Sequence, residues 1–149
     1  MKKVSLLAAL AMLVAAVALA TTGGALADHS PPDGPAVPGV LVPMDAANAC
    51  DGGKKIENPA SGVYVLSFGT FTMNIQITVV NTALGPTITF VSLDPSELVT
   101  SMFVKGGPVA NFYDYGTGIG HDDGLHSPVN PNNNKYYGLS HLCIFADKK

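Results

Sequence analysis

Residues 70–79 read Thr-Phe-Thr-Met-Asn-Ile-Gln-Ile-Thr-Val, and this stretch decides the fold class of the chain. Polar and apolar side chains alternate from Thr70 to Val79 without a break. Successive side chains of a β-strand point to opposite faces of its sheet, so one face of this stretch is apolar and the other polar. Its Thr, Ile and Val residues also suit a pleated surface. The stretch therefore predicts an antiparallel strand with one face on a core and the other in solvent.

Shorter stretches on both sides repeat this pattern between turn residues. We expect further strands at residues 63–68, 87–93, 98–105, 109–115 and 139–145. Glycine and proline separate several of them, as in Leu84-Gly85-Pro86. Because short strands alternate with turns and no amphipathic helix is visible, the chain predicts an all-β antiparallel sandwich of about six to eight strands, immunoglobulin-like or jelly-roll-like.

The segment at residues 116–138 is crowded with Gly, Pro, Asn and Asp. We expect it to form a long loop between the last two strands. Loops of this length usually carry function or lack order, and the sequence leaves both readings open.

The N-terminus predicts export. Lys2 and Lys3 precede an apolar run at residues 4–20, and Ala25-Leu26-Ala27 has the small-x-small pattern of a cleavage site. A retained membrane anchor is the alternative, but the Ala-rich run is short and weakly hydrophobic for a span. We therefore expect a signal peptide at residues 1–27 and a secreted mature chain, starting at Asp28, that spans no membrane.

Length and composition indicate one folded domain after this leader. Residues 28–47 are rich in Pro, Gly, Ala and Asp and show no period, so we expect a linker or tail there. This assigns residues 48–149 to the sandwich domain. The chain has no Arg and a formal charge of −3, which makes it a poor match for a phosphate backbone. We expect no nucleic acid partner; an extracellular protein or a glycan remains open.

Two cysteines, Cys50 and Cys143, are present. In an oxidising compartment they predict one disulfide, and two buried free thiols are the alternative. Closing a loop of that length stabilises a fold by about 4–5 kcal/mol in the chain-entropy model. A single pair so far apart is not a zinc motif. On the last strand His141 shares the face of Cys143, so an inward-pointing Cys143 would place His141 inward or at the sheet edge.

The second half of the chain carries an ordered set of short motifs. They are Val104-Lys105-Gly106-Gly107, Ala110-Asn111-Phe112-Tyr113, Leu125-His126-Ser127-Pro128-Val129-Asn130-Pro131 and Tyr137-Gly138-Leu139-Ser140-His141, after an early Cys50-Asp51-Gly52-Gly53-Lys54-Lys55-Ile56. Together they resemble a family of small secreted bacterial β-domains of unassigned activity, especially of actinobacterial type.

This resemblance implies an extracellular β-module without an assigned reaction or ligand. Some members are attached to wall-anchored or adhesin-like regions, which favours surface interaction. One departure concerns the final cysteine, which in the family lies four residues after the Ser-His histidine. Here Cys143 lies two residues after His141, and an even shift keeps the same strand face.

Candidate metal ligands cluster in the Gly-rich segment. They are Asp114, His121, Asp122, Asp123 and His126. Carboxylates and imidazoles of this kind can hold a divalent cation, with Ca²⁺ favoured over Zn²⁺ because oxygen ligands dominate. Their spacing matches no known metal motif. The alternative is turn chemistry, in which Asp side chains bond the nearby backbone.

Candidate ligand-binding residues are aromatic or amide-bearing. They are Asn111, Tyr113, Tyr115, Asn130, Tyr136, Tyr137 and His141. Exposed Tyr stacks on sugars or anchors interfaces, whereas core packing is the alternative. Strand alternation places Phe112 on one face and Tyr113 with Tyr115 on the other, so we expect one of these sets in the core.

No catalytic residue is assigned. Ser140 and His141 are neighbours on an expected strand, so their side chains should point to opposite faces and not serve each other. The sequence thus predicts a secreted, non-catalytic module for cell-surface or envelope interaction or adhesion. A small glycan- or Ca²⁺-binding domain is the second hypothesis, and a secreted hydrolase the third. No cofactor is expected beyond the Ca²⁺ of that second hypothesis.

Overall fold

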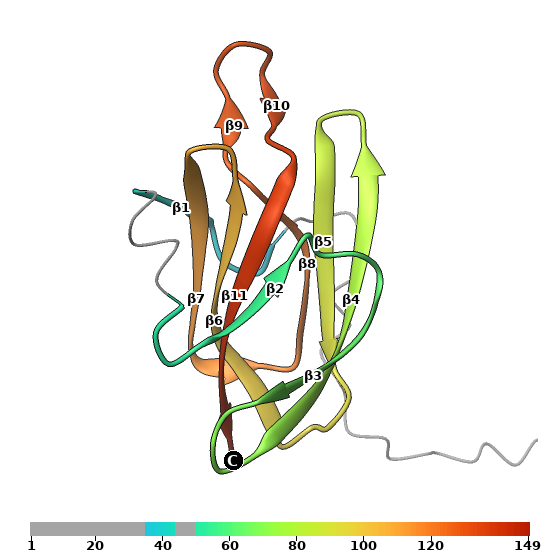
Figure 1. Cartoon of the computed structure of the whole chain (residues 1–149), viewed down its shortest axis with the longest axis vertical. Coiled ribbons are helices and arrows are strands. Elements are labelled where there is room, and N and C mark those ends of the chain that lie inside the picture. The colour runs from blue at the N-terminus through green and yellow to red at the C-terminus, as the bar shows by residue number, and fades with distance from the viewer. Residues whose placement is uncertain (1–34, 44–49) are drawn as a thin grey trace, which may run out of the picture.

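The computed structural model describes residues 35–43 and 50–149. The expected signal peptide lies outside these residues, as does most of the expected linker. The fold class is confirmed, because the described chain is all-β with antiparallel sheets packed together (Figure 1). Within the described ranges, no helix is long and apolar enough to cross a membrane.

One sheet has five strands in the order β1-β7-β6-β11-β2. Their bounds are β1 (Val40–Val42), β7 (Val109–Ile119), β6 (Glu97–Gly106), β11 (Leu139–Lys148) and β2 (Lys54–Glu57). The second sheet has four strands, β3 (Gly62–Ser67), β4 (Thr72–Thr82), β5 (Gly85–Ser92) and β8 (His121–His126), in that order. A small hairpin of β9 (Val129–Asn130) and β10 (Lys135–Tyr136) projects from one end of the molecule (Figure 1).

The core lies between the two sheets. Met73, Ile75 and Ile77 of β4 are fully buried, and the polar residues between them are exposed, so the alternation that predicted this strand is confirmed. The other sheet contributes residues such as Leu142 and Ile144 to the same apolar cluster. Burial of this cluster is the main favourable term in the stability of such a domain.

The prediction of a long loop at residues 116–138 is wrong. β7 continues to Ile119, β8 completes the four-stranded sheet, and β9 pairs with β10. Gly116, Gly118 and Gly124 have φ values of +58°, +93° and +67°, a conformation that glycine adopts without strain. These glycines shape irregular strands, and their abundance masked the strand period in the sequence.

The folded part also begins earlier than expected. Val40–Val42, placed in the linker by composition, forms β1 and pairs with β7, with Val40 opposite Phe112. The two sheets hold nine strands in the described ranges, against the six to eight expected. Strands as short as β1 and β2 cannot show a period, which explains why composition missed them.

The predicted Cys50–Cys143 disulfide is confirmed. Its orientation differs from the expectation, because Leu142 and Ile144 of β11 face the core. Cys143 and His141 therefore lie on the outer face of the five-stranded sheet, where both are nevertheless buried. The disulfide joins the segment that enters β2 to the neighbouring strand β11.

Candidate functional site

Gly106 is the last residue of β6, and Gly107 follows it. Residues from later in the chain pack closely against both glycines. A Cβ at position 106 would lie 2.6 Å from the Gly138 carbonyl oxygen and 2.7 Å from the Ser127 Cβ. At Gly107, where φ is +60°, a Cβ would lie 2.6 Å from the Tyr137 ring. The buried Ser127 hydroxyl donates to the Tyr137 carbonyl oxygen at 2.6 Å. Close packing therefore requires both glycines.

Asn111 and Tyr113 of β7 hold the backbone of His126 at the end of β8. The Asn111 amide donates to the His126 carbonyl oxygen at 3.0 Å. The Tyr113 hydroxyl donates to the same oxygen at 3.0 Å and accepts from the His126 backbone N–H at 2.9 Å. Asn111 and Tyr113 are buried, and their hydrogen bonds join β7 of the five-stranded sheet to β8 of the four-stranded sheet. Asn111, Tyr113 and His126, which belong to the short motifs noted in the sequence, thus form a structural junction between the two sheets.

A ring pair lies beside this junction. The His126 and Tyr136 rings stack with centroids 3.8 Å apart and planes 11° apart. The hairpin carries Tyr136 there, since the Tyr136 backbone N–H donates to the Leu84 carbonyl oxygen at 2.6 Å in the turn between β4 and β5. His126 Nδ1 lies 2.8 Å from the Ser127 carbonyl oxygen, which favours the tautomer protonated at Nδ1. The imidazole is thereby oriented as well as stacked.

An open groove of about 810 Å³ runs along the four-stranded sheet and reaches this ring pair. Besides His126 and Tyr136, its lining includes Val80, Leu84, Thr82, Thr87, Thr89 and Asp123. The groove offers aromatic and aliphatic carbon, one carboxylate and three threonines, of which Thr82 and Thr87 already donate their hydroxyls to backbone carbonyl oxygens. Concave, mainly apolar surfaces with a few polar groups are typical of ligand-binding sites.

The five candidate metal ligands do not come together. In the described part of the chain, the one group of three or more potential ligands within mutual reach is Cys50, His141 and Cys143. Asp114 instead accepts a hydrogen bond from the Gly116 backbone N–H at 2.9 Å, which is turn chemistry. Asp123 lines the groove, as does His126.

Asp122 is buried and engaged. Its Oδ1 accepts from the backbone N–H groups of Ala36 at 2.8 Å and Asp123 at 2.9 Å, and its Oδ2 accepts from the Tyr115 hydroxyl at 2.9 Å. Burial, followed by the nearby Asp122 charge, raises the pKa of Tyr115 far above its usual value. Asp122 therefore anchors the segment that precedes β1 as well as the core.

The candidate ligand-binding residues have different fates. Asn111, Tyr113, Tyr115 and His141 are buried, whereas Asn130, Tyr136 and Tyr137 are half-buried. Asn130 accepts from the Asn132 backbone N–H at 3.0 Å and so shapes the hairpin turn. Of the seven, Tyr136 alone lines the groove. Sequence reasoning missed the groove threonines, whose signal was the polar face of the strands around residues 78–89.

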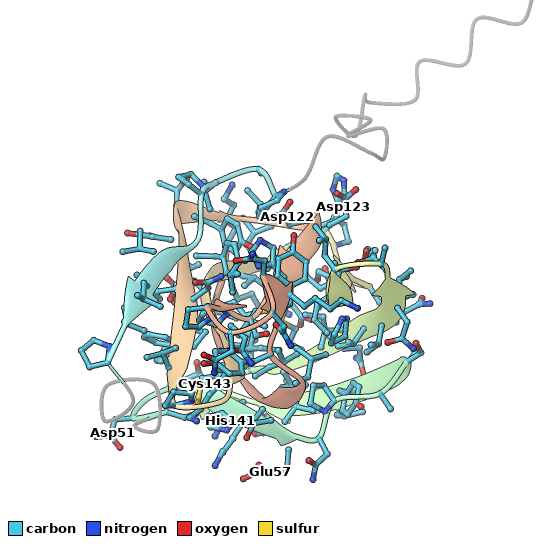
Figure 2. All side chains as sticks on the ribbon, turned by 90° about the horizontal axis from the view of Figure 1, so that it is seen from above. Asp51, Glu57, Asp122, Asp123, His141 and Cys143 are labelled. Atoms are coloured by element: carbon cyan, nitrogen blue, oxygen red, sulfur yellow. A yellow bond between two sulfur atoms is a disulfide. The ribbon has the colours of Figure 1, made fainter. Side chains whose placement is uncertain are left out.

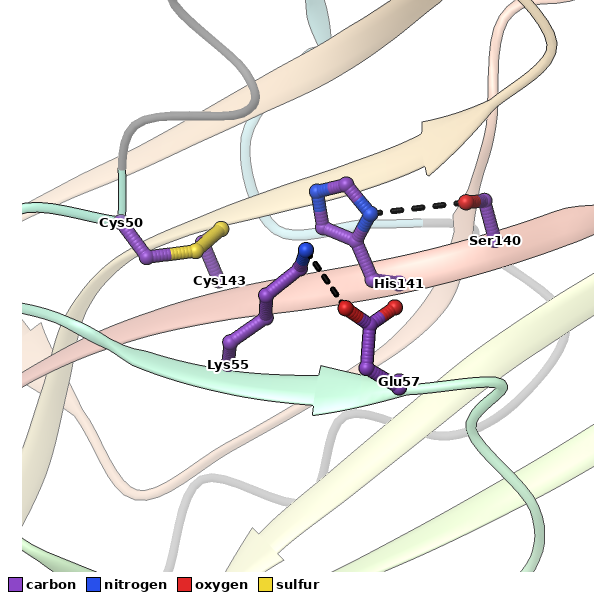
Figure 3. The surroundings of a disulfide bond; sticks show 6 residues. All are labelled: Cys50, Lys55, Glu57, Ser140, His141 and Cys143. Atoms are coloured by element: carbon purple, nitrogen blue, oxygen red, sulfur yellow. Dashed lines mark hydrogen bonds and ion pairs between the residues drawn. A yellow bond between two sulfur atoms is a disulfide. The ribbon is translucent and has the colours of Figure 1, made fainter.

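A second polar cluster surrounds the disulfide, on the side of the domain away from Asp122 and Asp123 (Figure 2). Ser140 Oγ lies 3.4 Å from His141 Nδ1 (Figure 3). The prediction that these neighbours point to opposite faces is therefore wrong, because a β-bulge between Leu139 and His141 interrupts the alternation. The Glu57 carboxylate, opposite His141 on β2, forms an ion pair with Lys55 Nζ at 2.6 Å.

Comparison of the chain with protein-family models, curated proteins and solved structures finds no match.

Proposed function

We propose that this chain is an exported, non-catalytic extracellular interaction module, and that the groove beside His126 and Tyr136 is its contact surface. The observation that carries the proposal is the oriented ring pair at the end of an open, mainly apolar groove. Rigid aromatic side chains supply contact area at low entropic cost, which makes them frequent anchors of recognition surfaces.

The extracellular location has two supports. A disulfide persists in oxidising compartments, and the described residues contain no membrane-spanning helix. The N-terminal pattern of a signal peptide and the resemblance to secreted bacterial β-domains add to this inference.

The Ser140–His141 contact gives little support to a secreted hydrolase. His141 is 3 % exposed, and Ser140 approaches its Nδ1 at 3.4 Å. A nucleophilic site needs a base that is accessible to the substrate, together with donors for the developing oxyanion. The groove, on another part of the surface, is the better-supported functional region.

A glycan is the ligand class that the groove supports best. Thr89 provides a hydroxyl and Asp123 a carboxylate. The Thr82 and Thr87 hydroxyls donate to the backbone and so act toward a ligand only as acceptors. These groups match the donors and acceptors of a sugar, while the ring pair offers a stacking surface for its C–H face. This places the small glycan-binding domain within the proposed role of surface or envelope interaction.

Binding of the mature chain to an array of defined oligosaccharides and to envelope polysaccharides tests the proposal. Tyr136→Ala should weaken the binding found there at least about tenfold, as expected for an aromatic anchor. Thr89→Val keeps the side-chain shape and should weaken it as well, because it removes a hydroxyl from the groove. Thr72→Val, an exposed position outside the groove, is the matched control. Binding that survives both groove substitutions would exclude this surface.

A further inference from the structure

The disulfide and the neighbouring imidazole bring together three side chains of kinds that bind metal ions. The sulfur atoms of Cys50 and Cys143 and a ring nitrogen of His141 all lie within 4.8 Å of one another. His141 and Cys143 are 3 % and 0 % exposed, and Cys50 is half-buried. Two thiolates and one imidazole would suit Zn²⁺ or Cu⁺, since soft sulfur ligands select these cations.

One strand supplies two of the three ligands, and Cys50 precedes the neighbouring strand β2. His141 and Cys143 are two residues apart on β11 and so share one face. Across β11, β2 places Glu57 opposite His141 and Lys55 opposite Cys143. Such a framework holds ligands more firmly than a loop does.

We propose that, once the disulfide is reduced, Cys50, Cys143 and His141 bind a d¹⁰ cation, Zn²⁺ or Cu⁺. In a tetrahedral zinc site, bond lengths of about 2.0–2.3 Å place neighbouring ligand atoms about 3.3–3.8 Å apart. In the oxidised protein the two sulfurs are bonded to each other and so lie closer together than this, and the imidazole nitrogen lies within 4.8 Å of both. Breaking the S–S bond lets the two sulfurs separate enough to admit the ion.

The reaction is a two-electron reduction followed by metal exchange for protons. An external dithiol transfers two electrons and two protons to the disulfide, giving two protein thiols and the oxidised reductant. The metal ion then replaces the thiol protons of Cys50 and Cys143, which are released to water, and accepts the imidazole lone pair. Cys50 is half-buried and Cys143 is fully buried, so Cys50 is the more accessible half of the disulfide.

Nearby groups favour this state. Ser140 Oγ contacts His141 Nδ1, and Figure 3 shows the other ring nitrogen on the side of the disulfide. A hydrogen bond at one ring nitrogen orients a histidine that ligates through the other. Lys55, opposite Cys143, forms an ion pair with Glu57, so these two side chains together add no net charge beside the sulfurs. For Zn²⁺, water supplies the fourth ligand.

The test uses the mature chain, reduced with a water-soluble phosphine under anaerobic conditions. Zn²⁺ is titrated against a chromophoric chelator, and Cu⁺ against a Cu⁺-specific chelator. The reduced protein should bind one ion about a hundredfold more tightly than the disulfide-bonded protein or the Cys50→Ser/Cys143→Ser variant. His141→Gln should weaken binding at least about tenfold, whereas His121→Gln on β8 should leave it unchanged. With Co²⁺ as the probe, a sulfur-to-metal charge-transfer band should appear only in the reduced protein.

Several results would overturn the proposal. One is equal affinity in the reduced protein and in the double Ser variant for both cations. Another is a His141→Gln affinity equal to that of the unmodified protein. If reduction unfolds the chain, Zn²⁺ or Cu⁺ should restore the near-ultraviolet circular dichroism of the core tyrosines; failure of both ions to do so would also refute the site.

Discussion

The hydroxyl of Tyr113 bonds both backbone groups of His126, accepting from the N–H at 2.9 Å and donating to the carbonyl oxygen at 3.0 Å. Tyr113 lies in the core and belongs to the five-stranded sheet, whereas His126 ends a strand of the other sheet. One side chain thus closes the sandwich at the position where the ring pair begins. The groove consequently depends on a buried side chain, Tyr113, that does not line it.

Tyr113→Phe should lower the free energy of unfolding by about 1–3 kcal/mol, because it leaves the His126 backbone N–H without this acceptor. Urea unfolding followed by circular dichroism measures the change. Tyr64→Phe is the matched control, since the Tyr64 hydroxyl makes its bonds to Ala60 at an exposed position. An equal decrease in the free energy of unfolding in both variants would show that the Tyr113–His126 bonds contribute no more than an exposed tyrosine hydroxyl does.

Gly106→Ala should lower the free energy of unfolding by about 1–3 kcal/mol, because the added carbon overlaps the Gly138 carbonyl oxygen and Ser127. Gly138→Ala is the control, as a Cβ there meets nothing within 4 Å. Thermal or urea unfolding of both variants compares them directly. Similar stability of the two variants would argue against close packing at Gly106.

Two of the five tyrosines should resist ionisation. Burial raises the pKa of Tyr113 and, together with the Asp122 charge, that of Tyr115, from the ordinary value of 10.0. A group with a raised folded pKa contributes stability below its unfolded pKa, and this stability is lost as pH rises above that value. Stability should therefore fall above about pH 10.

Absorbance titration at alkaline pH checks this expectation. Tyr113 and Tyr115 should ionise late, together with unfolding, and Tyr115→Phe should reduce the alkaline loss of stability relative to the unmodified chain. Ionisation of all tyrosines in one step near pH 10, with the fold intact, is the contrary result.

Removing the disulfide with Cys50→Ala/Cys143→Ala should lower the free energy of unfolding by about 2–5 kcal/mol, because the bridge closes a long loop in the unfolded chain. Urea unfolding of the oxidised protein and the variant gives the difference. An unchanged midpoint would mean that the bridge contributes little to stability and serves another purpose.

Calcium should leave the thermal midpoint of the disulfide-bonded protein unchanged. The Asp122 carboxylate already accepts three hydrogen bonds, and Asp114 accepts one from its own turn. Differential scanning in EDTA and in millimolar Ca²⁺ measures the effect. A clear rise with Ca²⁺ would show that these carboxylates rearrange around an ion bound to the folded state.

Strand alternation and the two cysteines by themselves determined the fold class, the buried face of β4 and the disulfide. The period of residues 70–79 specified an all-β fold and the buried face of β4, because side-chain direction along a strand is a local property. The two cysteines, together with the expectation of export, predicted the disulfide that the structure contains. Local patterns failed where glycines made strands irregular, as in β8, and where a bulge brought Ser140 to His141.

Tertiary structure alone decided where the sites lie. The packing of Leu142 and Ile144 into the core places His141 and Cys143 on the outer face of β11, and the sequence pattern alone did not show this. The groove joins β4, β5, β8 and the β9–β10 hairpin, whose residues are far apart in the chain. Side-chain alternation gives two faces to every strand, but only the packing of the sheets selects which face is buried and which strands share a surface.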